Sequence, residues 1–321
     1  MLVDMPLEQL KKYTGINPRP SDFDAFWDRS IEEMLAIDPA VELIPSQFQV
    51  EFAECFDLYF TGIGGSRIHA KLLRPRREED RRGPAVIQYH GYSGNCGDWE
   101  AKLGYVAAGF TVAALDCRGQ GGRSQDLTSV TGTTLRGHII RGVDEESPDK
   151  LLFREIFLDC AQLVHIVAGM PGVDKNRIGL MGGSQGGGLT LAAGSLCPFV
   201  NRLAPCYPFL SDYRRVWEMD LAKDAYQELK DYFRRHDPRH EREEAFFTRL
   251  GYIDIHFLTS RIRGKVKMFT AMMDTVCPPS TQFAAFNAIT APKDVVIYPD
   301  FGHEGLPDCG DITMQFMLEM L

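Results

Sequence analysis

Short apolar runs alternate with helical segments along most of the chain, and this alternation constrains the fold more than any other feature. Residues 151–170 repeat apolar positions at helical spacing between two of the runs. The runs carry few charges, as expected of strands covered on both faces; they lie at residues 85–89, 110–115, 177–181, 266–273 and 294–298. Strands that alternate with helices predict an α/β fold with a mostly parallel, doubly wound sheet.

We expect residues 1–321 to form a single domain that begins with an N-terminal extension, residues 1–45. Within the extension, the stretch that starts at Ser21 and Asp22 begins a helical pattern with a polar cap and an acidic first turn. Residues 50–60 and 67–73 then alternate polar and apolar side chains on either side of a glycine-rich turn. This pattern predicts an antiparallel hairpin ahead of the parallel strands.

Residues 212–263 interrupt the alternation of strands and helices. Their helix-like pieces, residues 213–232 and 243–259, are dense in charges of both signs and in aromatic side chains. We interpret this segment as an inserted helical cap over the functional edge of the sheet, with the charged faces in water. The alternative is a set of surface helices remote from any site, since function in a loop or insertion is not visible in sequence alone.

A single serine among five glycines lies between an apolar run and an alanine-rich helical segment. Gly182 to Gly186 match the pattern GxSxG, in which small neighbours allow a serine to stand exposed on a strand-to-helix turn as a nucleophile. Ser184 is therefore the candidate nucleophile. The alternatives are a glycine-rich tight turn or a phosphate-binding loop at a helix N-terminus. The spacing of a Walker loop is absent, because no Lys-Ser or Lys-Thr pair follows the glycines.

A serine hydroxyl needs a histidine to take its proton and a carboxylate to orient that histidine. On sheets of the α/β-hydrolase type these partners follow in the chain order serine, acid, histidine. Asp274 comes after the fourth apolar run and His303 after the fifth, so both satisfy that order. Asp300 is the competing acid, but it precedes His303 by only three residues and would have to fold back to reach the ring.

The same reaction needs two backbone N–H groups that stabilise the oxyanion. Gln185 follows the candidate nucleophile at the start of a helix, and Tyr92 lies in a glycine-containing loop after the first apolar run. We expect the backbone N–H groups of these two residues to form the oxyanion hole. We interpret His90 and Arg118 as structural, Arg118 through paired bonds to carboxylate or carbonyl groups, and Gln120 stays outside the catalytic set.

Composition excludes several classes of partner. A net charge of −9 disfavours nucleic acid and anionic membranes as main partners. The N-terminus lacks a signal-peptide pattern and no apolar run is long enough to span a membrane, so we expect a cytoplasmic protein. The eight cysteines form no CxxC pair and no cluster with zinc-ligand spacing, so we expect no disulfide framework and no zinc site.

Taken together, these motifs resemble the acetyl xylan esterase and cephalosporin C deacetylase family, carbohydrate esterase family seven, which has the α/β-hydrolase fold. The matching motifs are RGQG at 118–121, GxSQG at 182–186 and HE at 303–304, and the likeness covers nearly the whole chain. The resemblance implies Ser184, Asp274 and His303 as the triad, with Tyr92 and Gln185 as oxyanion donors. It also implies small acetylated substrates such as xylo-oligosaccharides and cephalosporin C, no cofactor or metal, and an intracellular homohexamer.

The chain departs from the family pattern at three places that border the pocket or an interface. The loop after RGQG is shorter, His90 stands where the family usually has a nonbasic residue, and Cys206 stands where we expect an aspartate. The leading hypothesis is a serine esterase that removes acetyl groups. The alternatives are an α/β-hydrolase of other specificity, such as a peptidase, although related peptidases usually carry a large extra domain, and a catalytically silent scaffold.

Overall fold

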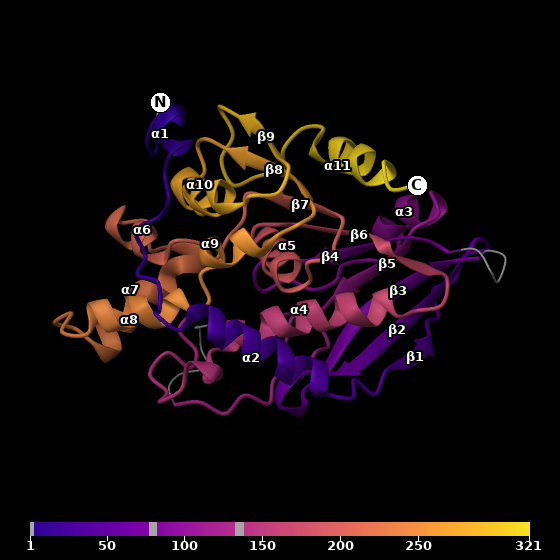
Figure 1. Cartoon of the computed structure of the whole chain (residues 1–321), viewed down its shortest axis with the longest axis horizontal. Helices are drawn as coiled ribbons and strands as arrows, with labels where there is room; N and C mark the ends of the chain where they lie inside the picture. The colour runs from indigo at the N-terminus through magenta and orange to yellow at the C-terminus, as the bar shows by residue number, and fades with distance from the viewer. Residues whose placement is uncertain (1–2, 77–81, 132–137) are drawn as a thin grey trace.

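A nine-stranded sheet forms the centre of the molecule. The computed structural model describes residues 3–76, 82–131 and 138–321. The strand order is β1-β2-β3-β5-β4-β6-β7-β8-β9 (Figure 1). The strands are β1 Glu42–Pro45, β2 Ala53–Thr61, β3 Arg67–Pro75, β4 Gly83–Tyr89, β5 Thr111–Leu115, β6 Val173–Gly183, β7 Arg202–Cys206, β8 Lys265–Ala271 and β9 Lys293–Tyr298.

Strand direction divides the sheet into two parts. The strands β1, β2, β3 and β5 pair antiparallel, whereas every pair from β5 through β4, β6, β7 and β8 to β9 is parallel. The predicted hairpin is confirmed, with Tyr59 opposite His69 in the β2–β3 pair. The predicted parallel sheet is confirmed as well, and it places the carboxyl ends of β4 to β9 along one edge, where ligand and catalytic groups gather in such sheets.

Helices cover both faces of the sheet, as a doubly wound fold requires. Ile87 of β4 packs into the core beneath α4 and α5, and its neighbour Val86 packs into a second core with residues of α3 and α11. The helices are α1 Leu7–Leu10, α2 Phe23–Ala36, α3 Leu103–Ala107, α4 Leu152–Ala168, α5 Gln185–Leu196, α6 Tyr213–Glu218, α7 Gln227–His236, α8 Glu243–Gly251, α9 Ile255–Leu258, α10 Pro279–Ala288 and α11 Cys309–Leu318.

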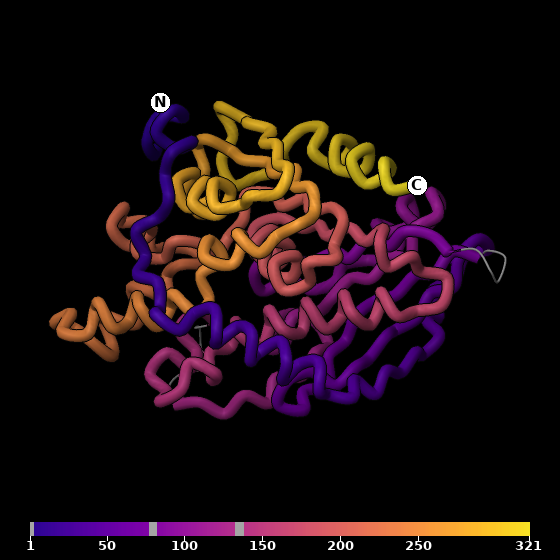
Figure 2. The backbone as a smooth tube through the Cα atoms, viewed as in Figure 1, coloured from indigo at the N-terminus to yellow at the C-terminus, as the bar shows by residue number. Residues whose placement is uncertain are grey.

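The predicted N-terminal helix is present as α2, which lies along α4 (Figure 2). Its buried side chains, including Phe26 and Trp27, face the core, and the Trp27 indole N–H donates to the Tyr252 carbonyl over 2.9 Å. The expected polar cap is present by position but not by hydrogen bonding. Asp22 occupies the cap position, but its side chain makes no capping bond, because it accepts a hydrogen bond from the Tyr252 hydroxyl instead.

The sequence analysis did not predict two of the strands, β1 and β7. The strand β1 is short and largely exposed at the edge of the sheet, so it lacks a continuous apolar signal. The strand β7 contains Pro205, and a proline within a run argues against a central strand because it removes a donor. Accordingly, β7 pairs with β8 at Arg202, Leu203 and Cys206 but not at the two residues between.

The segment between β7 and β8 contains α6 to α9, and its helices are shorter than the sequence pattern predicts. The expected helix over 213–232 is interrupted between α6 and α7, where Asp220 and Asp224 adopt positive φ angles of 56° and 50°. The second piece is interrupted before α9, which Asp254 caps by accepting from the His256 backbone N–H. Among the helices of the described residues, none has both the length and the apolar character needed to cross a bilayer.

Candidate active site

Ser184 stands on the turn between β6 and α5 with a strained backbone. Its φ of 56° and ψ of −119° are rarely adopted by a residue with a side chain. The turn is tight because the neighbours are glycines: a Cβ on Gly186 would lie 2.1 Å from the Tyr89 carbonyl oxygen, and one on Gly182 would lie 2.6 Å from the same atom. The glycines therefore allow α5 to start against the end of β4.

The structure brings together the three side chains singled out as nucleophile, base and acid. His303, after β9, places its Nε2 atom 3.0 Å from Ser184 Oγ, and its Nδ1 atom lies 2.8 Å from Asp274 Oδ2. Ser184 and Asp274 follow β6 and β8, so all three stand at the carboxyl edge of the parallel strands. A continuous hydrogen-bonded chain from hydroxyl to imidazole to carboxylate results, which we call the Ser–His–Asp chain.

Hydrogen bonds that do not involve the histidine hold Asp274 in place. Its side chain is fully buried, and its other oxygen, Oδ1, accepts from the backbone N–H groups of Val276 and Cys277, each over 2.8 Å. These bonds hold the carboxylate so that Oδ2 faces the imidazole and selects the tautomer with a proton on Nδ1. Asp300, the competing acid, is exposed.

The loop after β4 and the start of α5 are adjacent, as the two predicted oxyanion donors require. The side-chain amide of Gln185 contacts the His90 carbonyl over 3.4 Å. Gln120 joins the loops: its Oε1 accepts from the Ser93 backbone N–H over 2.9 Å, and its amide exchanges hydrogen bonds of 2.8 and 3.0 Å with that of Gln185. This amide pair was not predicted from the sequence, because Gln120 and Gln185 lie 65 residues apart, one on the loop after β5 and the other at the start of α5.

His90 has the structural role predicted for it. Its Nδ1 lies 2.7 Å from the Gly91 carbonyl oxygen, and its Nε2 accepts from the Cys117 backbone N–H over 3.0 Å. Burial lowers the pKa of His90, and this outweighs the opposing effects of the Gly91 bond and the Asp116 carboxylate. The neutral ring therefore ties the loop after β4 to the loop after β5.

Arg118 also has the structural role predicted for it. Its Nε and Nη2 atoms each donate to one oxygen of Asp159 over 2.7 Å, and Nη1 donates to Glu155. The Nη2 atom also donates to the Ile63 carbonyl. The guanidinium is buried, so it anchors the loop after β5 to α4 and to the turn of the hairpin.

A second buried histidine cluster lies beside this loop and was not recognised in the sequence. His69 contacts Asp116 through Nδ1 over 2.6 Å and Asp57 through Nε2 over 2.9 Å. Burial raises the pKa of Asp116, but hydrogen bonds from His69 and from the Arg123 and Cys96 backbone N–H groups outweigh it, so the pKa lies well below its usual value. Both ring nitrogens of His69 therefore face carboxylates, one on the loop after β5 and one on β2.

Aromatic and thiol side chains surround the reacting serine and histidine. The Tyr207 ring packs against the His303 ring with centroids 4.7 Å apart, and a Cβ on Gly183 would lie 3.5 Å from that tyrosine. Burial raises the pKa of the Cys277 thiol well above its usual value, which keeps this neighbour of the site uncharged. Tyr207 and Cys277 therefore border the Ser–His–Asp chain without adding a charge to it.

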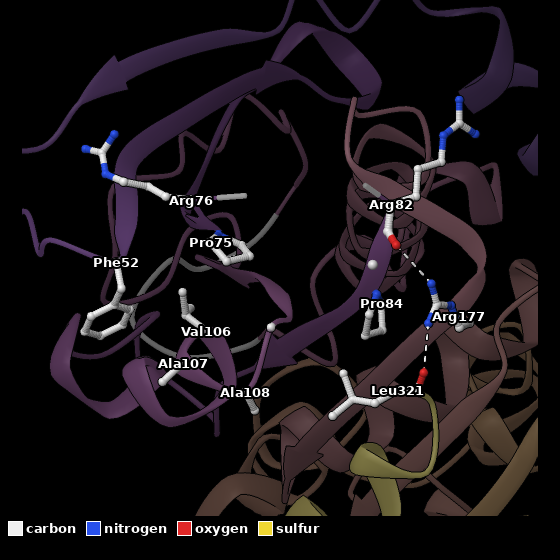
Figure 3. A pocket seen from close by; sticks show the side chains of 12 residues that line it. Phe52, Pro75, Arg76, Arg82, Pro84, Val106, Ala107, Ala108, Arg177 and Leu321 are labelled. Atoms are coloured by element: carbon white, nitrogen blue, oxygen red, sulfur yellow. Dashed lines mark hydrogen bonds between the residues drawn. The ribbon is translucent and has the colours of Figure 1, made fainter. Parts of the chain in front are cut away.

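Two cavities differ in their relation to this chain. The larger, of about 820 Å³, lies at the amino end of β4 between Arg82, Arg177 and the C-terminal Leu321 (Figure 3), whereas Ser184 follows the carboxyl end of the neighbouring strand β6. The smaller, of about 570 Å³, lies between the loop after β4 and the β7–β8 segment; it is lined by Tyr92, Ser93, His138, Lys223, Asp224, Gln227 and Glu228. The smaller cavity is the one relevant to catalysis, because Tyr92, a predicted oxyanion donor, lines it.

A serine on a strand-to-helix turn, followed along a mostly parallel sheet by a buried aspartate and a histidine bonded to each other, defines an α/β-hydrolase. The family model described as acetyl xylan esterase (AXE1) matches residues 1–320. The chain therefore belongs to the acetyl xylan esterase family and is a carboxylic ester hydrolase.

Individual relatives agree with this family. The chain is 60% identical to acetyl xylan esterase 1 from Thermoanaerobacterium sp. JW/SL YS485, with a TM-score of 0.97 over 99% of each chain. It is 35% identical to an acetyl xylan esterase from Paenibacillus sp. R4, with a TM-score of 0.93 over 99% of this chain and 100% of that one. It is 26% identical over 306 residues to acetyl esterase Axe7A from Xylanibacter ruminicola, covering 91% of this chain and 64% of that protein's length.

Proposed function

We propose that the protein removes acetyl groups from small acetylated sugars through an acetyl-enzyme on Ser184. The observation that carries the proposal is the Ser–His–Asp chain, in which His303 contacts Ser184 Oγ over 3.0 Å and Asp274 over 2.8 Å. In this proposal His303 Nε2 takes the hydroxyl proton while Oγ attacks the acetyl carbonyl carbon. Asp274 holds the ring in the required tautomer and stabilises the imidazolium that forms.

The tetrahedral oxyanion accepts hydrogen bonds from the backbone N–H groups of Tyr92 and Gln185. Support for this assignment comes from the contact between the loop after β4 and the start of α5, and from the helix N-terminus at Gln185, where the dipole favours negative charge. The intermediate then collapses: the bond from the acetyl carbon to the sugar oxygen breaks, and His303 gives its proton to that oxygen, so that the sugar leaves with a free hydroxyl. In the second half of the reaction His303 deprotonates a water molecule, which attacks the acetyl group and frees Ser184.

The proposed substrates are acetylated xylo-oligosaccharides and cephalosporin C, and no cofactor or metal takes part. The names of the relatives support the acetyl and xylan part of this proposal. We also propose that residues 212–263 act as the cap over this site within a single domain, and that residues 1–45 form its extension. Glu228 of α7 supports the cap, because it accepts hydrogen bonds from the Tyr92 hydroxyl and the Ile139 backbone N–H.

The quaternary proposal is a cytoplasmic homohexamer, as the family resemblance implies. Apolar side chains at the end of α2 and near the edge strand β1 support an interface on this side of the sheet. Leu35 is 56% exposed, and Val41 and Ile44 are 42% and 43% exposed. Unpaired backbone groups on β1 add a further reason to cover this edge.

Two measurements test the reaction. A fluorophosphonate probe should label Ser184 in the wild type and leave Ser184→Ala unlabelled; absence of labelling in the folded wild type would indicate a silent scaffold. A panel of acetylated xylose, acetylated xylo-oligosaccharides, cephalosporin C, longer acyl esters and peptide amides should show turnover concentrated on acetyl esters. Faster cleavage of the amides would instead support a peptidase.

A further inference from the structure

Two thiols meet beside the Ser–His–Asp chain. Cys206 is the last residue of β7 and Cys309 is the first residue of α11, and their Sγ atoms lie 3.9 Å apart. Both side chains are half-buried and reduced. Among the eight cysteines, the other half-buried one is Cys96, and the remaining five are buried. Cys206 and Cys309 therefore combine proximity to each other with access to solvent.

The surroundings of the two thiols give them different reactivities. The hydrogen bond between the two thiols lowers the pKa of Cys309, and a further bond with Thr313 acts in the same direction. Cys309 also stands at the N-terminus of a helix of 10 residues, where the dipole stabilises a thiolate. The contact with Cys309, together with burial, raises the pKa of Cys206. This asymmetry makes Cys309 the attacking thiol and Cys206 the resolving thiol of a pair.

The pair connects the segments that hold the serine and the histidine. The Cys206 carbonyl accepts from the Ser184 backbone N–H over 3.0 Å, and the next residue, Tyr207, packs its ring against His303. Cys309 follows His303 by six residues, at the end of the loop that carries the histidine. A bond between the two sulfurs would therefore tie that loop to the end of β7.

We propose that Cys206 and Cys309 form a reversible disulfide with small-molecule disulfides such as oxidised glutathione, and that this bridge lowers the esterase activity of the adjacent site. The Cys309 thiolate attacks one sulfur of oxidised glutathione, a mixed disulfide forms and one glutathione thiolate leaves. The Cys206 thiolate then attacks the Cys309 sulfur and releases the second glutathione. The protein loses two electrons and two protons, and one oxidised glutathione becomes two reduced glutathione molecules.

The second part of the proposal rests on the proposed function. A disulfide needs its sulfurs about 2.05 Å apart, so closing the present gap of 3.9 Å must move β7, the His303 loop or both. Displacements of about 1 Å at reacting groups can cost about a hundredfold in rate. We expect the bridge to lower kcat/KM for an acetyl ester by about tenfold or more, with recovery after reduction by dithiothreitol.

The test exposes the full-length protein to glutathione buffers of increasing oxidised fraction, followed by digestion and mass spectrometry. The wild type should yield a peptide linked through Cys206 and Cys309. Cys206→Ser should stop at a glutathione adduct on Cys309, and Cys309→Ser should form neither product at this site. Cys96→Ser removes the third half-buried thiol and should form the bridge and lose activity as the wild type does.

Absence of the linked peptide at high oxidised glutathione, with no adduct on Cys309 in Cys206→Ser, would overturn the proposal. It also fails if the bridge forms but acetyl ester turnover is the same before and after reduction. The bridge and the adduct are read by mass and need no turnover. A chain that forms them but hydrolyses no ester would refute the proposed function and leave the thiol chemistry established.

Discussion

Each member of the Ser–His–Asp chain is held by a different kind of constraint. Ser184 is fixed by the backbone, since a tight turn between glycines fixes where its Cβ points. Asp274 is fixed by the two backbone N–H groups that bind Oδ1. His303 is held by its two hydrogen bonds and by the ring of Tyr207. Loss of the aspartate therefore frees the histidine without disturbing the serine.

This arrangement separates the two candidate acids. We expect Asp274→Asn to lower kcat for an acetyl ester by about ten-thousandfold, because an amide in place of the carboxylate favours the wrong imidazole tautomer. Asp300→Asn, the matched control on the same loop as His303, is exposed and should cost less than about threefold, as surface changes usually do. Steady-state kinetics of both variants decide the question. A crippled Asp300→Asn beside a nearly normal Asp274→Asn would remove Asp274 from the site.

The lowered pKa of His90 predicts that the stability of the fold depends on pH. Its pKa is lower in the folded protein than in the unfolded chain, because burial disfavours the charged ring. As the pH falls, His90 therefore takes up its proton more readily in the unfolded chain than in the folded protein, and this favours unfolding. The free energy of unfolding is unaffected by His90 above the unfolded pKa of about 6.5, and it decreases as the pH falls from there through the folded pKa. His90→Gln keeps an acceptor for the Cys117 N–H but does not titrate. The decrease in Tm between about pH 7.5 and pH 5 should be smaller in this variant; an equal decrease would contradict the prediction.

At the scale of elements, close contact between α5 and β4 decides where the nucleophile stands. Gly186→Ala would place a Cβ 2.1 Å from the Tyr89 carbonyl oxygen, and backbone must move to relieve the clash. We expect this variant to lower the free energy of unfolding by about 3 kcal/mol and to reduce activity, because α5 carries Gln185. Gly310→Ala is the control, since a Cβ there meets open space within α11. It should leave stability unchanged or raise it by up to about 1 kcal/mol in denaturant titrations.

The elements that the sequence predicted correctly are those whose burial leaves a local signal. The strands β4, β5, β6, β8 and β9 and the helix α4 each contain an apolar run or an apolar repeat, and these patterns identified them in the sequence. Pro205 concealed β7, and the exposed edge position concealed β1. The breaks at Asp220 and Asp224 depend on positive φ angles that no periodicity reveals.

The candidate site, too, was predicted in part from the sequence and in part not. The positions of Ser184, Asp274 and His303 were predicted because a turn motif and the order of strands suffice to place them at one edge. The contacts of Gln120 with Gln185 and of Tyr207 with His303 join residues from different strand ends. Such contacts depend on side-chain rotamers and on the path of loops, which leave no pattern in the sequence.

At the scale of the whole molecule, the proposed hexamer predicts a mass in solution. Sedimentation equilibrium or light scattering should give six times the chain mass of 36.1 kDa. Replacing Leu35 and Ile44 together by lysine should reduce this mass, because two charges would enter the apolar surface near β1. Unchanged circular dichroism would show that the subunit still folds. A wild type that sediments as a monomer would contradict the hexamer.

The backbone conformation of Ser184 lowers the stability of the folded protein. Glycine adopts a φ of 56° without the steric cost that any Cβ incurs there. Neither Ser184→Gly nor Ser184→Ala can form an acyl-enzyme, so the two variants compare stability alone. We expect the free energy of unfolding of Ser184→Gly, measured by denaturant titration, to be about 1 kcal/mol higher than that of Ser184→Ala. Equal stability of the two would mean that the turn is relaxed. The nucleophile thus imposes a cost on the fold at the position where it stands, and mutations that stabilise other regions would offset that cost without changing the reacting groups.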